Sequence, residues 1–598
     1  MPGIVGIIRH GHRDGVEQDL ATMLATMHHE PFYTDGQYIN HDLGLYVGWT
    51  CHQGSPCDLE PIVDRRNNRV IIFHGEHHPI EDGVSAEKYP AQFLDMLGGD
   101  LEPFLRSLNG WFCGVVADIG RRETVLFNDR YGIGRVYVHE ASNEFLFASE
   151  AKSLLKMRSS LRSVEPDALA EYTRYNCVFR NKTLFKGISL LPPASSWVFE
   201  RSHRPQTRQY FAPKEWETLP TLSVEHFWDR FQETASRVVP RYLHGGQRVA
   251  LSLTAGLDTR LILAAIPSDA WPLPCYTFGG LWGETFDVRT ARTLAKIKSS
   301  PFDIIRVDEA FLKDFPRYAE RTVYISDGTH DVLGAHDVYF NQRARAIAPV
   351  RLTGKFGSEI VRIRKLIPTL TYGEGLLGRD LRARIDALPT PDQILSPHPL
   401  SRVVFEEIPW YEFGRLAIEQ AYIALRTPYM DNELVSLMYQ APPQVRSRGE
   451  AQAQYVRARS RPLASVLTNL GSLGGTSPTI NRLLYLPFWL LFKVEYTYLY
   501  ATPHWLTRID RALERWQPER VFSGRQKFEG YRIWLRSHFA NFVRDTLLRS
   551  NSQVSDFFDR AAIHRIVAQH LAGTHNHLDE INKLLTLELM WSSLLAGA

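Results

Sequence analysis

The sequence predicts two domains of different fold class. An α+β layered domain comes first, and an α/β domain with a parallel sheet and a helical C-terminal region follows it. The chain has 598 residues, too many for one hydrophobic core. Short apolar runs with few helices fill the first quarter of the chain, whereas apolar runs and helical patterns alternate after residue 248.

The composition is that of an ordinary globular protein. Hydrophobic residues make up 44% of the chain and charged residues 23%, and the net charge of +3 is too small to indicate nucleic acid or membrane binding. The five cysteines form no CxxC pair, which favours reduced thiols. We therefore expect a cytoplasmic protein with no nucleic-acid partner and no membrane span; a homodimer is compatible with the sequence.

The most apolar segment is residues 483–500, and it contains Lys493 and Glu495. These charges interrupt it too much for a spanning helix. We expect an interior helix or a helix that lies on the surface.

The first domain is predicted to cover residues 1–205, with a linker around 200–220. Its expected strands are 1–8, 43–52, 69–73, 111–117, 124–127 and 136–139, and its expected helices are 16–28 and 89–107. Runs of strand with few helices are typical of an α+β layered domain. The second domain is predicted to cover residues 216–598.

The second domain is organised around residues 248–266, which predict a strand, a turn of small residues and a helix. Such a turn aims backbone N–H groups and a helix N-terminus at one point, where they favour a phosphate. Turns of this kind also occur in folds that bind nothing. The carboxylate of Asp258 would repel phosphate, so we interpret it as a ligand of Mg²⁺.

The turn resembles the S-G-G-x-D-S pyrophosphate loop of ATP pyrophosphatases. Thr254 and Thr259 stand where the motif has Ser, and Ala255 stands where it has its first Gly. The nucleotide-binding residues implied here are Leu253, Thr254, Ala255, Gly256, Leu257, Asp258 and Thr259.

Further strands are expected at 274–278, 302–307 and 350–353, with helical patterns at 285–297 and 309–348. This alternation predicts a parallel sheet that is covered on both faces, with ligands at the carboxyl ends of its strands. Phe278 ends the second strand and is assigned to the nucleotide site. Gly354, Gly357 and Glu359 follow the fourth strand, and we expect Glu359 to share the metal with Asp258.

Three ordered segments of the first domain carry a more specific resemblance. They are LNGWFCGVVAD (108–118), NDRYGIGRVYV (128–138) and FASEAKSLL (147–155). They resemble segments of the glutamine-dependent asparagine synthetases, and residues 354–360 resemble the S-G-x-G-A-D-E loop of that family. The resemblance implies an N-terminal-nucleophile (Ntn-hydrolase-like) glutaminase domain followed by an ATP-pyrophosphatase synthetase domain.

The chain departs from that family at the glutaminase site. Pro2 stands where the family has its nucleophilic cysteine, and proline has no thiol to attack an amide. His74 replaces the Asn of the N-G-E turn, and residues 49–51 lack the arginine of the R-R-L-S segment. Neither Cys51 nor Cys57 is at the N-terminus, so neither is expected to replace the nucleophilic cysteine. We expect a scaffold without glutaminase activity.

The resemblance continues to residues 419–446, where Arg426 and Asp431 lie on an R-x-P-F-x-D segment; we expect these two side chains to pair. The family then has a lysine that faces the reacting centre. Residues 451–463 have none, so Arg457 and Arg459 are the candidate catalytic cations.

The resemblance thus implies an amide-forming ligase that uses ATP and Mg²⁺. It would adenylate a carboxylate substrate, release pyrophosphate and transfer an amine donor to the acyl group. Two alternatives stay open: a ring-closing ligase like the β-lactam synthetases and lasso-peptide cyclases, and a non-catalytic nucleotide-binding scaffold. The sequence identifies neither the acyl substrate nor the amine donor. His575, His577 and Glu580 are expected in a surface loop rather than a metal site.

Overall fold

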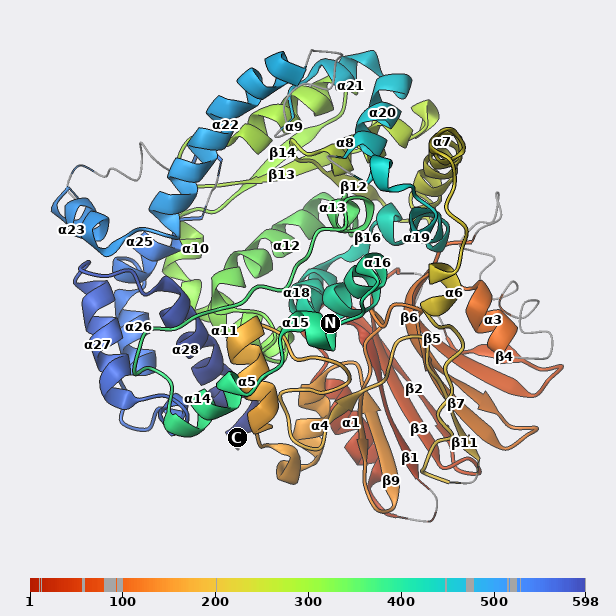
Figure 1. Ribbon diagram of the computed structural model, residues 1–598. Helices are drawn as coiled ribbons and strands as arrows, with labels where there is room; N and C mark the ends of the chain where they lie inside the picture. Colours follow the sequence, from red (N-terminus) through yellow and green to blue (C-terminus); the bar gives the residue numbers. More distant parts are fainter. Residues whose placement is uncertain are drawn as a thin grey trace.

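The structure of the chain is a computed structural model (Figure 1). It describes residues 1–596 except 10, 12, 56–59, 80–92, 94–100, 201, 447–448, 469–477, 514–515, 517–523 and 527–528. For residues 478–485, 488 and 504 it describes the backbone alone.

The first domain contains two stacked antiparallel sheets (Figure 1, lower right). In spatial order, one sheet consists of β10 (Ser189–Leu190), β8 (Tyr137–Glu140), β9 (Glu144–Ala148), β1 (Gly3–Arg9), β3 (Leu45–His52) and β2 (Tyr33–Asn40). The other consists of β11 (Ser196–Glu200), β7 (Glu123–Asn128), β6 (Gly110–Asp118), β5 (Arg69–His77) and β4 (Ile62–Asp64). Strands β2, β4, β9, β10 and β11 are additions to the predicted set.

The alternation of β1 explains the layering. Ile4 and Ile8 point into the core between the sheets, whereas Val5 and Ile7 face the helix side. Helices α1 (Val16–Ala25) and α4 (Ala151–Met157) cover that side. Helix α3 (Leu101–Ser107) packs on the second sheet, and most of the predicted helix 89–107 lies outside the described residues. The expected α+β layering is present.

The second domain contains the predicted parallel sheet. Its spatial order is β14 (Phe302–Arg306), β13 (Cys275–Gly279), β12 (Val249–Ser252), β15 (Val350–Leu352) and β16 (Ala424–Arg426). Leu251 packs toward α7 (Val224–Arg241), α8 (Leu257–Ala265) and α9 (Phe286–Ile297), and Ala250 toward α11 (Phe315–Ile325) and α12 (Ala335–Ile347). Both faces are covered, as expected. Strand β16 was not predicted.

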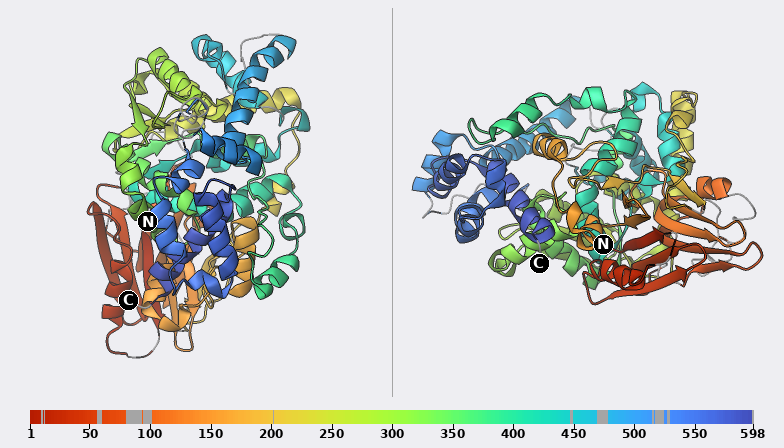
Figure 2. Two further views of the ribbon diagram at one scale, coloured as in Figure 1. Left: turned by 90° about the vertical axis from the view of Figure 1, so that its left-hand side faces the viewer. Right: turned by 90° about the horizontal axis from the view of Figure 1, so that it is seen from below.

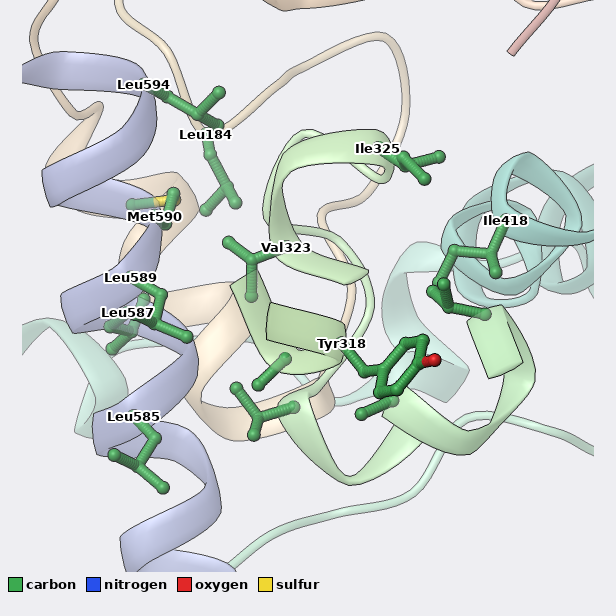
Figure 3. Close-up of a cluster of buried hydrophobic side chains, with 14 of the residues drawn as sticks. Leu184, Tyr318, Val323, Ile325, Ile418, Leu585, Leu587, Leu589, Met590 and Leu594 are labelled. Carbon is green, nitrogen blue, oxygen red and sulfur yellow. The ribbon is translucent and has the colours of Figure 1, made fainter. Parts of the chain in front are cut away.

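The C-terminal region is helical, as predicted. Its helices are α22 (Pro478–Leu499), α23 (His504–Ala512), α25 (Tyr531–Arg536), α26 (Ala540–Leu547), α27 (Arg560–Leu571) and α28 (Leu578–Met590). Figure 3 shows leucines of α28 and Met590 across from Val323 of α11 and near Leu184 of the first domain, so one hydrophobic cluster joins both domains. Helices α26–α28 lie away from the stacked sheets (Figure 2).

The remaining helices connect these layers. They are α5 (Pro166–Tyr175), α6 (Lys214–Glu217), α10 (Glu309–Lys313), α13 (Gly357–Val361), α14 (Arg379–Asp386), α15 (Pro391–Ile394), α16 (Pro399–Ser401), α17 (Ile408–Tyr411), α18 (Phe413–Tyr422), α19 (Asn432–Tyr439), α20 (Glu450–Arg459) and α21 (Arg461–Ser465). Tyr210 and Phe211 of the expected linker are buried in a core shared by both domains. The linker is therefore packed rather than extended in solvent.

Candidate active site

The first candidate site lies where the parallel sheet changes winding direction. Strands β13 and β14 lie on one side of β12, and β15 and β16 on the other. Because connections leave in opposite directions there, a crevice opens at the carboxyl ends of β12 and β15. A cavity of about 310 Å³ occupies this place. Its lining residues are Ser252, Thr254, Asp258, Thr259, Thr353, Gly354, Lys355, Phe356, Ser358, Glu359, Leu366, Glu412 and Arg415.

Two glycines allow the loops after β12 and β15 to touch. A Cβ on Gly354 would lie 2.6 Å from the backbone N of Thr259, and one on Gly357 would lie 2.7 Å from the side chain of Asp258. Any larger residue would push the loops apart. Phe356, between them, has φ of +68°, a left-handed conformation that is rare for a bulky residue. The structure therefore brings the two predicted loops together at the cost of local backbone strain.

Asp258 is held in a fixed orientation. Its carboxylate accepts hydrogen bonds from Ser358 Oγ at 2.6 Å and from Gln452 Nε2 at 2.8 Å, and Arg362 lies 3.8 Å away. Burial nevertheless raises the pKa of Asp258 above its usual range. Ser358, which stands where the resembling family has a carboxylate, thus positions the metal-ligand candidate.

Glu359 lies on the same cavity wall. Burial raises its pKa, and the negative charges of Asp258 and Glu412 raise it further. A divalent cation would relieve this repulsion. Within the described part of the chain, no group of three or more His, Cys, Asp or Glu residues could hold a metal, so Asp258 and Glu359 would bind one only with help from another ligand.

The predicted phosphate loop makes its own hydrogen bonds. The N–H of Ala255 donates to Asp287 Oδ1 at 2.7 Å, and the N–H of Gly256 donates to Thr254 Oγ1 at 3.2 Å. Thr259 Oγ1 lies 3.2 Å from Thr254 Oγ1. The carboxylate of Asp287 thus accepts from the N–H of Ala255, a donor that was expected to bind phosphate. The sequence analysis missed Asp287; its place in the first turn of α9, after the second strand, was the available signal.

Lys355 is the second residue that the sequence analysis missed. Its Nζ lies 3.3 Å from Glu419 and 3.4 Å from Glu412, at the cavity wall. Arg415 also lines the cavity and lies 3.2 Å from Asp337. The position of Lys355 directly after the fourth strand indicated this role.

Other predicted site residues lie elsewhere. Leu253 and Leu257 are buried behind the loop, and Phe278 stacks on Phe340 with ring centroids 4.5 Å apart. Arg457 pairs with Glu450, and Arg459 donates to Ser236 Oγ at 2.7 Å. A catalytic role for these two arginines stays a prediction, because neither is among the residues that line the cavity.

A second cavity, of about 120 Å³, lies between the first domain and β16. The described lining includes Pro2, His52, His74, Glu76, His78, Trp111, Cys113, Ser149, Tyr242 and Arg426. Burial lowers the pKa of His52 and of His78 to about 3 and that of His74 to about 4, so all three imidazoles are neutral at pH 7.

One ion pair crosses this second cavity. Arg426 donates from Nε and Nη2 to the two oxygens of Glu76, at 2.8 Å each, and its Nη1 donates to the carbonyl oxygen of His244 at 2.7 Å. Burial would raise the pKa of Glu76, but the Arg426 guanidinium holds it below its usual range. The expected pairing of Arg426 with Asp431 is wrong, because Asp431 lies 3.5 Å from Arg241 and accepts from Asn109.

Two other sequence-derived expectations concern cysteine and histidine. Cys51 is a buried thiol with its Sγ 3.9 Å from His74 Nδ1, and Cys57 lies outside the described residues. His575 and His577 lie in the expected loop before α28, whereas Glu580 is in its first turn; His577 lies 3.5 Å from Glu580 and 3.0 Å from Gln569.

Comparison with known proteins relates the first part of the chain to the glutamine amidotransferases. The glutamine amidotransferase domain family matches residues 94–211. A relative from Methanocaldococcus jannaschii, named as asparagine synthetase (glutamine-hydrolyzing) 2, is 21% identical over 60% of this chain and 75% of its own length. One from Acanthamoeba polyphaga mimivirus, named as asparagine synthetase (glutamine-hydrolyzing), is 22% identical over 56% of this chain and 58% of its own length. The chain is thus similar to the asparagine synthetases in sequence, and its first domain matches the glutamine amidotransferase domain family.

Solved structures give a weaker likeness. The glutamine phosphoribosylpyrophosphate amidotransferase of B. subtilis, complexed with ADP and GMP, is 8% identical over 52% of this chain and 69% of its own, with a TM-score of 0.24. A structure of the allosteric regulatory enzyme of purine biosynthesis is 8% identical over 51% of this chain and 80% of its own, with a TM-score of 0.25. These scores carry no argument about this chain.

Proposed function

We propose that the protein is an ATP-dependent amide-forming ligase that adenylates a carboxylate, releases pyrophosphate and then joins an amine to the acyl group. Its amine would not come from a glutaminase of its own. The observation that carries the ligase proposal is the cavity at the switch point, where the loop of Thr254 and Asp258 meets the loop of Glu359. The similarity to named asparagine synthetases supports the same reaction class.

Asp258 and Glu359 fit Mg²⁺ that arrives with nucleotide phosphates. Mg²⁺ is commonly bound by one or two carboxylates, and phosphate oxygens and water complete its shell. When bound, the ion would supply positive charge for the leaving pyrophosphate. Ser358 and Gln452 would keep the Asp258 carboxylate aimed at it.

The phosphate loop would bind the pyrophosphate through the N–H groups of Ala255 and Gly256 and the hydroxyls of Thr254 and Thr259. For this, the carboxylate of Asp287 must leave the N–H of Ala255. Lys355 would stabilise negative charge near the acyl carbon, because it is the lysine on the cavity wall. Holding both reactants in one cavity makes their reaction effectively unimolecular.

The second cavity supports the absence of glutaminase activity. Pro2 offers no thiol there, and His74 replaces the family's asparagine. The guanidinium of Arg426 already occupies both oxygens of Glu76. Without its own ammonia supply, the ligase would take an amine from solution or from the acyl substrate itself, as a ring-closing ligase does. Free ammonia would serve poorly, because at neutral pH it is mostly ammonium.

The test is AMP release, followed by mass spectrometry of the products. Reactions contain ATP, Mg²⁺ and a panel of carboxylates, each with glutamine, ammonium or a primary amine, or with an amine on the same molecule. We expect no asparagine from aspartate and glutamine, little from aspartate and ammonium, and faster AMP release with a tethered amine. Efficient asparagine formation from glutamine would overturn the proposal. Tight binding of ATP with Mg²⁺ but no AMP with any substrate would favour the scaffold alternative.

A further inference from the structure

The exposed apolar surface of the molecule is concentrated in one place. Among the described residues, all but two of the exposed large hydrophobic side chains lie between residues 486 and 516, on and just after helices α22 and α23. These side chains form what we call the apolar patch. The two exceptions are Val63 and Val224. In Figure 1 the two helices run along the upper left rim and out to the left edge. A patch of this kind marks an interaction site.

The exposed side of α23 carries an apolar stripe. Trp505 is 64% exposed and Ile509 is 47% exposed, four residues apart and therefore on one face of the helix; Trp516, beyond its end, is 72% exposed. Thr507 and Asp510 of the same helix are buried. The helix thus turns its apolar residues outward and a carboxylate inward, the reverse of a surface helix that packs on a core.

Helix α22 continues the patch. Trp489, Leu490 and Phe492 are each at least 37% exposed. Near its end, Leu499 is buried and anchors the helix to Ile533. The predicted surface-lying helix over 483–500 is therefore correct, and an interior position is wrong. No helix in the described part of the chain is long and apolar enough to span a membrane.

The described and exposed charges around the apolar patch have one sign. Among the described side chains from 486 to 516, the exposed ionic groups are Lys493, Arg508 and Arg511. The two described carboxylates of this stretch are buried and hydrogen-bonded within the protein. Glu495 accepts hydrogen bonds from the backbone N–H groups of residues 525 and 526, and Asp510 lies between two arginines of α25.

We propose that the apolar patch docks the protein on an anionic lipid surface, with α22 and α23 lying in the plane of the headgroups. Tryptophan and tyrosine favour the membrane–water interface, and lysine and arginine bind anionic headgroups while their stems cover apolar surface. A second copy of the chain is a poorer occupant, since a symmetric contact would bring these cations against their own copies.

The test is co-sedimentation of the full chain with vesicles of phosphatidylcholine, with and without phosphatidylglycerol. We expect strong binding only with phosphatidylglycerol, and weaker binding at high salt. Trp505→Ser with Trp516→Ser should lower binding at least roughly tenfold. Arg508→Gln with Arg511→Gln should lower it about 25-fold, about fivefold for each cation.

Val224→Ser is the matched control, because Val224 is an exposed apolar residue outside the patch; its binding should equal that of the unaltered chain. All variants should unfold at the same temperature, which excludes misfolding. The proposal is overturned if vesicles without anionic lipid bind equally well, or if the tryptophan variant still binds. It is also overturned if sedimentation shows a dimer that this variant dissociates while vesicles fail to bind. None of these outcomes depends on the ligase activity.

Discussion

The two cavities of this protein differ in how their charges are balanced. Between the domains, the carboxylate of Glu76 is neutralised by Arg426, and the surrounding imidazoles are uncharged. At the switch point of the parallel sheet, Lys355 pairs with Glu412 and Arg362 lies 3.8 Å from Asp258, yet burial still raises the pKa values of Asp258 and Glu359.

This difference indicates which buried charges stabilise the fold and which are available for binding or catalysis. A neutralised pair in a cavity stabilises an interface, whereas buried like charges raise the energy of the protein until a cation or substrate arrives. The cavity at the switch point is therefore the better candidate for chemistry. Four experiments test this difference between the two cavities.

The largest expected effect is on Asp258. The Asp258→Asn variant should keep its fold and lose carboxylate-dependent AMP formation by roughly a thousandfold, because one charged metal ligand is worth several kcal/mol at the transition state. Initial rates of AMP release measure this. Asp303→Asn, at an exposed position of β14 in the same sheet, is the control and should keep its rate. Near-normal turnover of Asp258→Asn would show that this loop is not part of the active site.

The next effect is on stability at the domain interface. Arg426→Met should lower the free energy of unfolding by about 3 kcal/mol, because it leaves the buried Glu76 carboxylate without its partner. Glu76→Gln in the same chain should restore much of that loss. Denaturant unfolding of the two single variants and the double variant gives the coupling. Additive losses would show that the pair does not stabilise the interface.

A third test uses pH. The pKa values of His52, His74 and His78 in the folded protein are lowered to about 3 or 4, so their stabilising effect is full above the unfolded pKa of about 6.5 and is lost as pH falls toward the folded value. At pH 5 each of these histidines should lower the free energy of unfolding by up to about 2 kcal/mol. Unfolding measured at pH 7, 6 and 5 should show this decline, and His78→Phe should make it shallower. An equal slope in that variant would contradict the assignment.

The smallest effect should come from Arg457→Gln and Arg459→Gln, which we expect to change the rate of AMP formation by less than about twofold, because neither side chain lines the cavity. Lys355→Met, by contrast, should lower kcat by about tenfold to a hundredfold. Lys365→Met, which alters an exposed lysine, is the control. If Arg457→Gln reduces kcat more than Lys355→Met, the original sequence prediction is correct.

Local sequence patterns specify most of the helices and strands and the loops between them. Period-two alternation in β1 and the strand–turn–helix pattern at 248–266 depend on neighbours within a few residues, so both could be predicted. The site roles of Gly354, Gly357, Asp258 and Glu359 were inferred from the resemblance of their loops to motifs of known families, and they stay predictions.

Which distant side chains meet depends on how the whole chain packs. Arg426 pairs with Glu76, 350 residues earlier, rather than with the nearby Asp431. Lys355 and Asp287 reach the candidate site because β15 pairs with β12 and because α9 follows the strand on its other side. Likewise, the sequence left open whether residues 483–500 lie inside the protein or on its surface, and the packing of the chain leaves an apolar face of α22 exposed. Periodicity specifies that a helix has an apolar face; the packing of the whole chain decides whether that face is covered.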